Sequence, residues 1–514
     1  MTKEKLADEV IRKIKGENLS KKDIQKLKTK LASEYKIEIP GNEYILSKAV
    51  GESKNVLEKL KRKPSRTLSG VSIVAVMTSP HKCPHGICVY CPKNDEVPQS
   101  YADGEPAVMR GKRLGFDPYK QVKTRIRQLE IIGHPVDKIE LIVMGGTFTS
   151  RDLKYQKWFV KGCYDGMNNI VSKTLEESKR KNERAKYRCV GLTVETRPDC
   201  MKKKEINQIL DYGATRVELG VQNPDDNIYK ITKRGHKIRD VVYSTRLLKD
   251  SGFKVCYHMM PNLPGSNLKK DLRMFKELFS NPDYKSDMLK IYPTLVVKKS
   301  ELEKWYLEDK FKPYYDEELI NLLCKMKSII PKYVRIMRLQ RDVPKKEIVA
   351  GCKYSNLREI VQREMKRKGL LCRCIRCREV GHRIRDGWKT GKFKLNVLEY
   401  KASKGKEFFL SYEDKNETLA GFLRLRIPYN PFREELQNST IVRELHVYGP
   451  EVPIGKKSNY FQHKGLGEKL LKEAERISKR NGFNKISIIS GVGVREYYRK
   501  FGYKLEGAYM CKKI

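Results

Sequence analysis

The stretch HKCPHGICVYCP, residues 81–92, places three cysteines and two histidines within twelve positions. It directly follows VSIVAVMTSP (71–80), an apolar run typical of a buried strand. The cysteines have the spacing Cx4Cx2C, and they are Cys83, Cys88 and Cys91. Such a set can bind a structural zinc ion, with His81 or His85 as the fourth ligand. It can also hold a [4Fe-4S] cluster with one iron left open for a substrate or cofactor.

Apolar, β-rich runs recur along the chain, with amphipathic segments such as DPYKQVKTRIRQLEIIG (117–133) between them. The runs cover residues 71–80, 138–148, 189–199, 215–222, 253–265, 288–297 and 334–342. Alternating helices and nearly all-apolar strands predict an α/β fold with a parallel sheet, open or partly closed into a barrel. Functional residues of such folds lie at the carboxyl ends of the strands. The cysteine stretch follows the first strand and therefore lies at such an end.

The charge of the chain is strongly positive. Its 514 residues include 108 Lys and Arg against 63 Asp and Glu, which gives a formal net charge of +45. The length predicts several domains, and the charge favours a polyanionic partner, most commonly nucleic acid. The alternative is a set of lysine-rich helix faces that are merely solvated.

The sequence shows no targeting or membrane signal. The start, MTKEKLADEV, is charged, and no run of about 18 apolar residues occurs anywhere. We therefore expect a cytoplasmic protein that does not contact a membrane. In that setting the 13 cysteines are better explained as metal ligands and small core residues than as disulfides.

The composition divides the chain into four parts. Residues 1–70 are predicted to form a basic helical extension, which either contacts nucleic acid or exposes solvated helix faces. The βα units occupy 71–345, and a basic linker follows at 346–390. Residues 391–514 are predicted to form antiparallel strands followed by a long helix, a strand, a short helix and a final strand.

The basic linker holds a second cysteine cluster, CRCIRCREVGH (372–382). Its three cysteines are Cys372, Cys374 and Cys377. With a fourth ligand, they predict a structural zinc site that joins the domains. His382 and Cys352 are both candidates for that ligand, and the sequence does not decide between them.

Motifs at the later strand ends decide between the readings of the first cluster. They are GGTF with Gly145 and Gly146, VETRP with Glu195, ELGVQ with Gln222, and MPNLPG. Over roughly residues 70–345 the chain resembles the radical S-adenosylmethionine superfamily, although its first cysteine gap is one residue longer than the usual CxxxCxxC. The resemblance implies a [4Fe-4S] cluster on the three cysteines of residues 81–92, with S-adenosylmethionine on the open iron. It also implies that the glycine pair approaches the methionine amino group, where an ordinary turn is the alternative.

A second cofactor motif follows the strand IVRELHVYG (441–449). FQHKGLGEKLLKEAERISKRNG (461–482) contains a Q-x-x-G-x-G loop that opens a helix, and such a helix end can bind a pyrophosphate. With the strand KISIISGVG and the segment REYYRKFGY, the region resembles the GNAT acetyltransferases, which bind acetyl-CoA. The resemblance implies pantetheine contacts by Glu444, Leu445, His446 and Val447, and pyrophosphate contacts by Leu466, Gly467 and Glu468. It also places Tyr497 and Tyr498 near the thioester, where a phenol could protonate the leaving thiolate, although one of the two is expected to be a core residue.

The combination of both domains on one basic chain resembles the catalytic subunit of Elongator. Stretches such as HPVDKIELIVMGGTF (134–148), RGH (234–236) and SGVGVREYYRKFGY (490–503) carry this resemblance nearly end to end. It implies an enzyme that builds a carboxymethyl group on carbon 5 of the wobble uridine in the tRNA anticodon stem-loop, with acetyl-CoA as the carbon source. It further implies an acetyl-CoA contact by Lys138, an electron donor, and either accessory Elongator-like subunits or a homo-oligomer. We also expect the acetyltransferase domain to fold back over the open strand ends of the barrel, so that the acetyl group reaches the adenosyl carbon.

Two rival functions come from other classes. A protein-lysine acetyltransferase would use the cluster only as structural support, but its lysine-rich substrates would be repelled by a charge of +45. A tRNA-binding scaffold with relic sites would have damaged cysteines or a damaged glycine loop, and both motifs are intact. The tRNA-modifying enzyme is therefore the function that the sequence favours.

Overall fold

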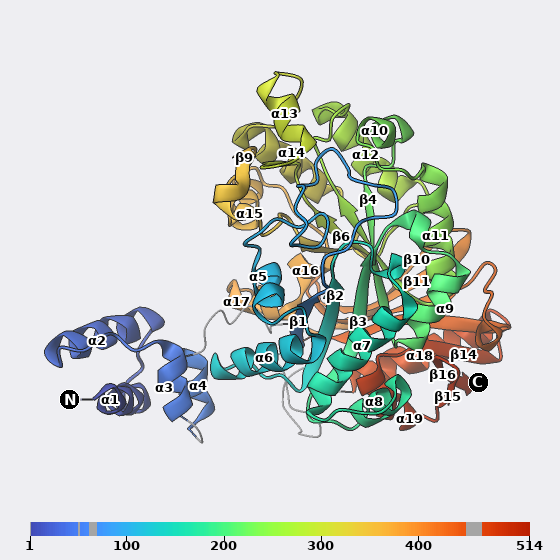
Figure 1. Cartoon of the computed structure of the whole chain (residues 1–514). Helices are drawn as coiled ribbons and strands as arrows, with labels where there is room; N and C mark the ends of the chain where they lie inside the picture. The colour runs from blue at the N-terminus through green and yellow to red at the C-terminus, as the bar shows by residue number, and fades with distance from the viewer. Residues whose placement is uncertain (1, 50–51, 61–68, 449–464) are drawn as a thin grey trace.

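The computed structural model describes residues 2–49, 52–60, 69–448 and 465–514. Figure 1 shows a small helical bundle at the N-terminus, a central α/β body and a second sheet toward the C-terminus. Two features from the sequence lie outside the described residues: most of the basic run that ends the extension (61–68) and the first part of the glycine loop (461–464). No helix in the described ranges is long and apolar enough to cross a membrane.

The N-terminal extension forms four helices with a core of their own. They are α1 (Lys3–Gly16), α2 (Lys21–Glu34), α3 (Asn42–Lys48) and α4 (Lys54–Leu60). Ser20 begins α2 with a capping box, because its hydroxyl accepts from the Asp23 backbone N–H while the Asp23 carboxylate accepts from the Ser20 backbone N–H. Apolar residues at helical spacing on α1, such as Leu6, Val10 and Ile14, are buried within this bundle. The extension thus packs by itself and contacts the body where α3 meets α6 (Pro118–Ile131).

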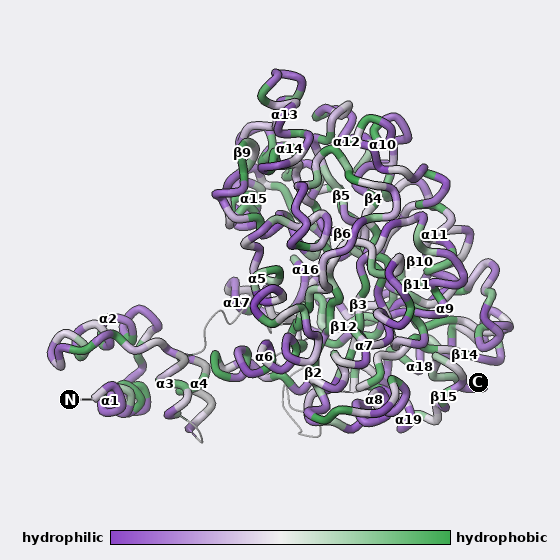
Figure 2. The backbone as a smooth tube through the Cα atoms, in the orientation of Figure 1, coloured by the Kyte–Doolittle hydropathy of each residue, from purple (hydrophilic) through white to green (hydrophobic). Residues whose placement is uncertain are grey.

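The central sheet has the strand order β1-β2-β3-β4-β5-β6-β8, and all neighbours are parallel. Each of the seven predicted runs overlaps one of these strands, and only β3 begins one residue before its run, so the predicted partial (β/α) barrel is confirmed. The strands are β1 (Ser72–Met77), β2 (Lys138–Met144), β3 (Arg188–Thr196), β4 (Arg216–Gln222), β5 (Lys254–Met259), β6 (Met288–Ile291) and β8 (Arg335–Arg338). Figure 2 shows hydrophobic segments along these strands and hydrophilic ones on the surrounding helices.

Helices surround this sheet (Figure 1). They are α5 (Pro106–Arg113), α6, α7 (Leu153–Asn168), α8 (Leu175–Asn182), α9 (Lys203–Asp211), α10 (Asp226–Ile231), α11 (Ile238–Asp250), α12 (Leu268–Ser280), α13 (Glu301–Leu307) and α14 (Asp316–Ser328). Val217 of β4 and Val255 of β5 pack with Ile206 of α9 and Val241 of α11 in one apolar core. Because side chains alternate along a strand, the residues between them in sequence face the inside of the barrel.

The segment 346–390, which the sequence predicts to be a linker, is largely folded. It contains β9 (Ile348–Ala350), α15 (Leu357–Arg367), α16 (Ile375–Arg378) and α17 (Val380–Arg385). β9 pairs with β7 (Val296–Val297), and α15 buries its apolar residues against the barrel core. The segment was predicted to be a linker because it is rich in basic residues. Its apolar positions 357, 361 and 365 nevertheless recur at helical spacing, and these side chains pack α15 against the barrel core.

The C-terminal domain is a mixed sheet of order β10-β11-β12-β13-β14-β16-β15, which confirms the predicted GNAT-type architecture. Its elements are β10 (Lys394–Ala402), β11 (Gly405–Glu413), β12 (Leu419–Ile427), β13 (Ser439–Val447), α18 (Leu466–Arg480), β14 (Lys485–Ile489), α19 (Arg495–Arg499), β15 (Lys504–Glu506) and β16 (Tyr509–Lys513). The single final strand predicted from the sequence is instead the hairpin of β15 and β16.

The two sheets meet at the amino ends of the barrel strands. Arg443 of β13 donates to the carbonyl oxygen of Phe253, which directly precedes β5, at 2.7 Å. Tyr509 of β16 donates to the carbonyl oxygen of Ser251 at 3.0 Å. The cysteine stretch follows β1 and lies at the carboxyl ends, so the expectation that the acetyltransferase domain covers the open strand ends is wrong. The amino ends carry buried carboxylates such as Asp287. Their negative charges are compensated by the positively charged arginines of the second sheet, such as Arg443.

Candidate active site

The loop after β1 holds its cysteines against positive and polar side chains. The Cys88 sulfur lies 3.4 Å from Nη1 of Arg234 and 3.2 Å from Nε2 of His85. A hydrogen bond from the Cys91 thiol, together with the charge of Arg234, holds the pKa of Cys88 well below its ordinary value despite burial. Cys83 lies 3.5 Å from the Thr147 hydroxyl. Three thiols on one loop beside a buried cation fit a group that requires thiolate ligands.

The glycine pair after β2 occupies backbone conformations that other residues rarely adopt. Gly145 has φ of +141° and Gly146 has φ of +83°. A Cβ on Gly145 would overlap the Thr78 side chain at the end of β1, and one on Gly146 would lie 3.0 Å from the Gln99 carbonyl oxygen. The glycines therefore allow the end of β2 to lie close to the end of β1 and to Gln99, in the segment that follows the cysteine loop.

Polar residues at the carboxyl ends link neighbouring strands around the same loop. Glu195 of β3 accepts a short hydrogen bond from the buried Tyr101 hydroxyl, and Arg341 lies over the Tyr101 ring at 4.6 Å. Gln222 of β4 is held at φ of +67°. Arg234, which contacts Cys88, also donates to the Gly220 carbonyl oxygen. Tyr101 and Arg234 thus connect the strand-end motifs to the cysteine loop. Neither contact could be predicted from the sequence.

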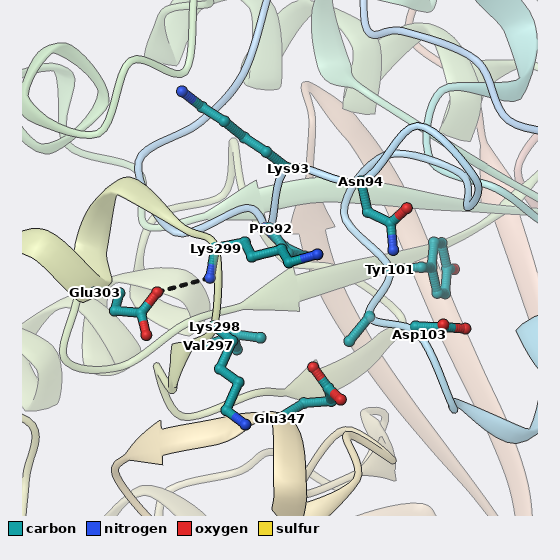
Figure 3. Close-up of a pocket in the computed structure, with 11 residues that line it drawn as sticks. Pro92, Lys93, Asn94, Tyr101, Asp103, Val297, Lys298, Lys299, Glu303 and Glu347 are labelled. Carbon is teal, nitrogen blue, oxygen red and sulfur yellow. Dashed lines mark hydrogen bonds between the residues drawn. The ribbon is translucent and has the colours of Figure 1, made fainter.

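A pocket of about 400 Å³ opens beside the cysteine loop (Figure 3). Its lining comprises Pro92, Lys93, Asn94, Tyr101, Ala102, Asp103, Val297, Lys298, Lys299, Glu303 and Glu347. Lys93, Lys298 and Lys299 are exposed. No carboxylate among the described residues pairs with their ammonium groups. The Glu303 carboxylate instead accepts from the Lys299 backbone N–H at 2.7 Å. The pocket therefore offers unpaired positive charge at the carboxyl ends of the barrel strands.

The second candidate site lies where two strands of the C-terminal sheet separate. β13 runs to Val447, but its parallel pairing with β14 ends at Val442. Glu444, Leu445, His446 and Val447 pair with β12. Among the described residues, no strand pairs with Glu444, Leu445 and His446 on the side of β14, and such an edge suits an extended chain.

The glycine loop and the two tyrosines converge on this opening. α18 begins after Gly465, which has φ of +71°, and its first turn holds Leu466, Gly467 and Glu468. The Tyr497 hydroxyl lies so close to Gly467 that a Cβ there would overlap it, and the same Cβ would be 3.8 Å from Val447. Tyr498 is buried in the apolar core of the domain. Burial raises the pKa of Tyr497 to about 12, so the phenol stays protonated at neutral pH.

The end of β13 faces the amino ends of the barrel strands. His446 Nε2 donates to the carbonyl oxygen of Ser69, just before β1, at 2.8 Å. Glu444 accepts from Arg424 Nε at 2.8 Å, and Arg424 also donates to the Asp287 carbonyl oxygen before β6. Lys138 is the first residue of β2 at the same end of the barrel. The second candidate site and the cysteine loop thus lie at opposite ends of one barrel.

The second cysteine cluster forms a compact group of sulfurs. The ligand atoms of Cys372, Cys374 and Cys377 all lie within 4.8 Å of one another. Hydrogen bonds from the other two thiols hold the pKa of Cys374 well below its ordinary value. His382 does not join this group; its Nε2 lies 3.6 Å from Oε2 of Glu379, and burial lowers its pKa to about 3. All 13 cysteines of the chain lie within the described residues and are free.

Family models match nearly the whole chain. The radical SAM superfamily matches residues 77–278, and its C-terminal domain matches 286–367. The acetyltransferase (GNAT) family matches 376–503. The ELP3 N-terminal domain matches 3–68. The chain therefore contains a radical SAM domain followed by a GNAT domain, as the motifs indicated.

Relatives match this chain over nearly its whole length. The "tRNA uridine(34) acetyltransferase" of Methanocaldococcus infernus is 52% identical over 100% of both chains. "Elongator complex protein 3" of Homo sapiens is 42% identical over 96% of this chain and 93% of its own length. A solved structure of "the archaeal Methanocaldococcus infernus Elp3 with N-terminus deletion (1-46)" is 51% identical, covers 87% of this chain and 100% of its own, and superposes with a TM-score of 0.79. This chain belongs to the family of the tRNA uridine(34) acetyltransferases and Elongator complex protein 3.

Proposed function

We propose that this protein modifies uridine 34, the wobble position of tRNA, by forming 5-carboxymethyluridine with carbon from acetyl-CoA. The observation that carries the proposal is the arrangement of two cofactor-type sites at opposite ends of one barrel. The cysteine loop and glycine pair lie at the carboxyl ends, while the opening between β13 and β14 faces the amino ends. Reagents bound at these ends would meet inside the barrel.

In this proposal Cys83, Cys88 and Cys91 hold a [4Fe-4S] cluster, and Gly145 and Gly146 leave room for S-adenosylmethionine. When bound, the cluster and S-adenosylmethionine supply a radical that can remove a hydrogen atom from the acetyl methyl group. Arg234 offsets the charge of the thiolates from 3.4 Å. Thr78 and Glu195 mark the strand ends against which the cofactor would lie.

Acetyl-CoA would bind along β13 beyond the end of its pairing with β14. The backbone of Glu444–Val447 would pair with pantetheine, and the first turn of α18, with Leu466, Gly467 and Glu468, would bind the pyrophosphate. The Tyr497 hydroxyl lies over Gly467 and would protonate a leaving thiolate there, whereas the buried Tyr498 would support the ring from the core. Lys138 would add a cationic contact from the barrel side.

The tRNA would approach the opposite end, where the pocket of Figure 3 exposes lysines. Lys93, Lys298 and Lys299 would bind phosphates beside the cysteine loop. The +45 charge of the chain and the N-terminal bundle would extend this electrostatic surface. The sulfurs of Cys372, Cys374 and Cys377 would hold a structural zinc ion.

Isotope transfer tests the proposal directly. Reconstituted enzyme with methyl-deuterated acetyl-CoA, S-adenosylmethionine, reductant and tRNA should yield deuterium in 5'-deoxyadenosine and carboxymethylated uridine 34. Changing Cys83→Ala should remove both products, whereas Cys511→Ala, a buried cysteine outside the loop, should keep both. Acetylation of protein lysines with no modified uridine would support the rival acetyltransferase function and refute this one.

A further inference from the structure

The inside of the barrel carries a line of buried charges that the two cofactor-type sites do not account for. Glu218 of β4 pairs in register with Cys256 of β5, and His258 of β5 pairs with Lys290 of β6. These positions alternate with Val217, Val255 and Tyr257, which face the outer helices. We call the inward-facing set Glu195, Glu218, His258 and Lys290 the lumen group. Charged side chains at inward positions of a barrel need a reason, because burial of each one costs free energy.

His258 is fixed on one side and open on the other. Its Nε2 lies 2.8 Å from Oε2 of Glu218, and its ring meets the Tyr292 ring edge to face at 5.4 Å. Nδ1 has no hydrogen-bond partner among the described residues. The His258 side chain keeps 15% of its surface accessible, whereas Glu218 keeps none and Lys290 keeps 8%. The imidazole is therefore the member of the group that a substrate inside the barrel can touch.

Glu218 stays ionised beneath this histidine. Burial opposes its charge, but Lys290, His258 and Arg216 hold the pKa of Glu218 far below its ordinary value. Lys290 also lies 3.6 Å from Glu195, and Arg216 Nε lies 3.5 Å from Glu218. A carboxylate that accepts from one ring nitrogen selects the tautomer, so the other nitrogen, Nδ1, keeps its lone pair as an acceptor.

The lumen group lies between the two candidate sites. Toward the amino ends, Glu444 is joined through Arg424 to Asp287, three residues before Lys290. Toward the carboxyl ends, Lys290 approaches Glu195, which accepts from Tyr101 in the segment that follows the cysteine loop. Among the described residues, Nη2 of Arg216 and Oε1 of Glu218 are buried without a hydrogen-bond partner.

We propose that His258, positioned by Glu218, is the general base that hydrolyses the thioester after the acetyl carbon has joined uracil. This inference rests on the proposed function, because a carboxymethyl product requires that water replace coenzyme A. Nδ1 of His258 takes a proton from water as the water oxygen bonds to the thioester carbonyl carbon. The C–S bond then breaks as the Tyr497 phenol protonates the thiolate. Nδ1 gives its proton to solvent and the phenolate regains one from solvent, so that a carboxylic acid and free coenzyme A leave. No oxidant or reductant is consumed.

The test separates carbon transfer from hydrolysis. His258→Gln can still hydrogen-bond Glu218 but cannot relay a proton, so 5'-deoxyadenosine formation should persist. Release of free carboxymethyluridine should fall about 10²- to 10⁴-fold, and a uridine–coenzyme A thioester should accumulate on tRNA, detected by mass spectrometry. In His258→Ala, added imidazole should restore release, a rescue that a merely structural role would not give. Glu218→Gln should slow hydrolysis as well.

The matched control is His134→Gln, which removes a buried histidine from the turn before β2 and should give free product as the wild type does. If His258→Gln releases free carboxymethyluridine at the wild-type rate, the inference is overturned while the proposed function stands. If His258→Ala accumulates the thioester but imidazole restores nothing, His258 only shapes the lumen and the general-base role is refuted. If the wild type itself forms no carboxymethyluridine, the proposed function fails.

Discussion

Replacing Arg443 by methionine should loosen the joint between the two domains more than any surface change. Arg443 is fully buried and donates to Asp287 at 2.5 and 2.8 Å and to Glu407 at 2.9 and 3.2 Å. Asp287 precedes β6 of the barrel, while Glu407 belongs to β11 of the second sheet. One guanidinium thus bridges carboxylates from both domains, and methionine keeps its length without its charge.

The magnitude follows from the charge balance of the buried network. Its bases are Lys249, Arg424, Arg426 and Arg443, and its acids are Asp250, Asp287, Glu407 and Glu444. Four charges of each sign cancel, so the loss of Arg443 leaves one buried negative charge without compensation. Removing one partner from such a site typically costs about 3–5 kcal/mol. At about 1.36 kcal/mol per decade, the interface should open about 10²- to 10⁴-fold more often.

Native-state hydrogen exchange measures this opening at the amides of β13 and β5. The control is Arg476→Met on α18, which makes the same chemical change at a side chain that is 52% exposed and pairs with Glu473. Exposed pairs contribute little, so exchange in the control should change less than about threefold. If Arg443→Met accelerates exchange no more than Arg476→Met does, the buried network does not hold the domains together and the reasoning from charge balance is refuted.

Three further predictions concern the candidate sites. Gly145→Ala, at φ of +141°, should lower the free energy of unfolding by about 1–3 kcal/mol. The control Gly16→Ala, where a Cβ meets nothing within 4 Å, should not lower it, and equal melting temperatures of the two variants would contradict the strain argument. Cys374→Ser should abolish bound zinc in elemental analysis of the purified protein, and full retention would exclude the cluster as a zinc site. Lys298→Ala with Lys299→Ala should weaken tRNA binding and reduce the slope of log affinity against log salt by about two; an unchanged slope would remove these lysines from the RNA surface.

The strand pattern and the motifs were readable from the sequence because they depend on local spacing. The apolar run 71–80 is bounded by polar residues, and β1 forms within it. The cysteine loop follows it directly, so connectivity alone places the loop at a carboxyl end. The Q-x-x-G-x-G stretch likewise predicts the start of α18, because the glycines directly precede an amphipathic helical pattern in the sequence.

The domain arrangement and the lumen group were not readable, because their contacts join distant residues. Arg443 and Asp287 are 156 positions apart in the sequence, and no local pattern around either residue predicts that they form an ion pair. Glu218 and Lys290 each read as single charges within apolar runs, and only the strand register brings them together. His258 stands within a quoted motif, HMMPNLPG, yet its pairing with Glu218 depends on how β4 and β5 align. One sequence feature could have indicated the lumen group: a charged residue at an inward-facing position of a buried strand.

The proposed function implies separate entrances for the two substrates. Under the proposed function, acetyl-CoA binds at the edge of β13 and reaches the barrel from its amino ends, while the lysine-lined pocket receives tRNA at the carboxyl ends. Neither substrate then blocks the other, and the reacting carbons meet where bulk water is sparse. Such a reaction tolerates little displacement of one domain against the other, since a shift of about 1 Å can cost about 10²-fold in rate. Buried ion pairs add little net stability over apolar packing. If one domain shifts against the other, however, their charges lose their partners, and the free energy of that misaligned arrangement rises. A joint built from Arg443, Asp287 and Glu407 therefore serves alignment of the two ends of the lumen more than it serves stability.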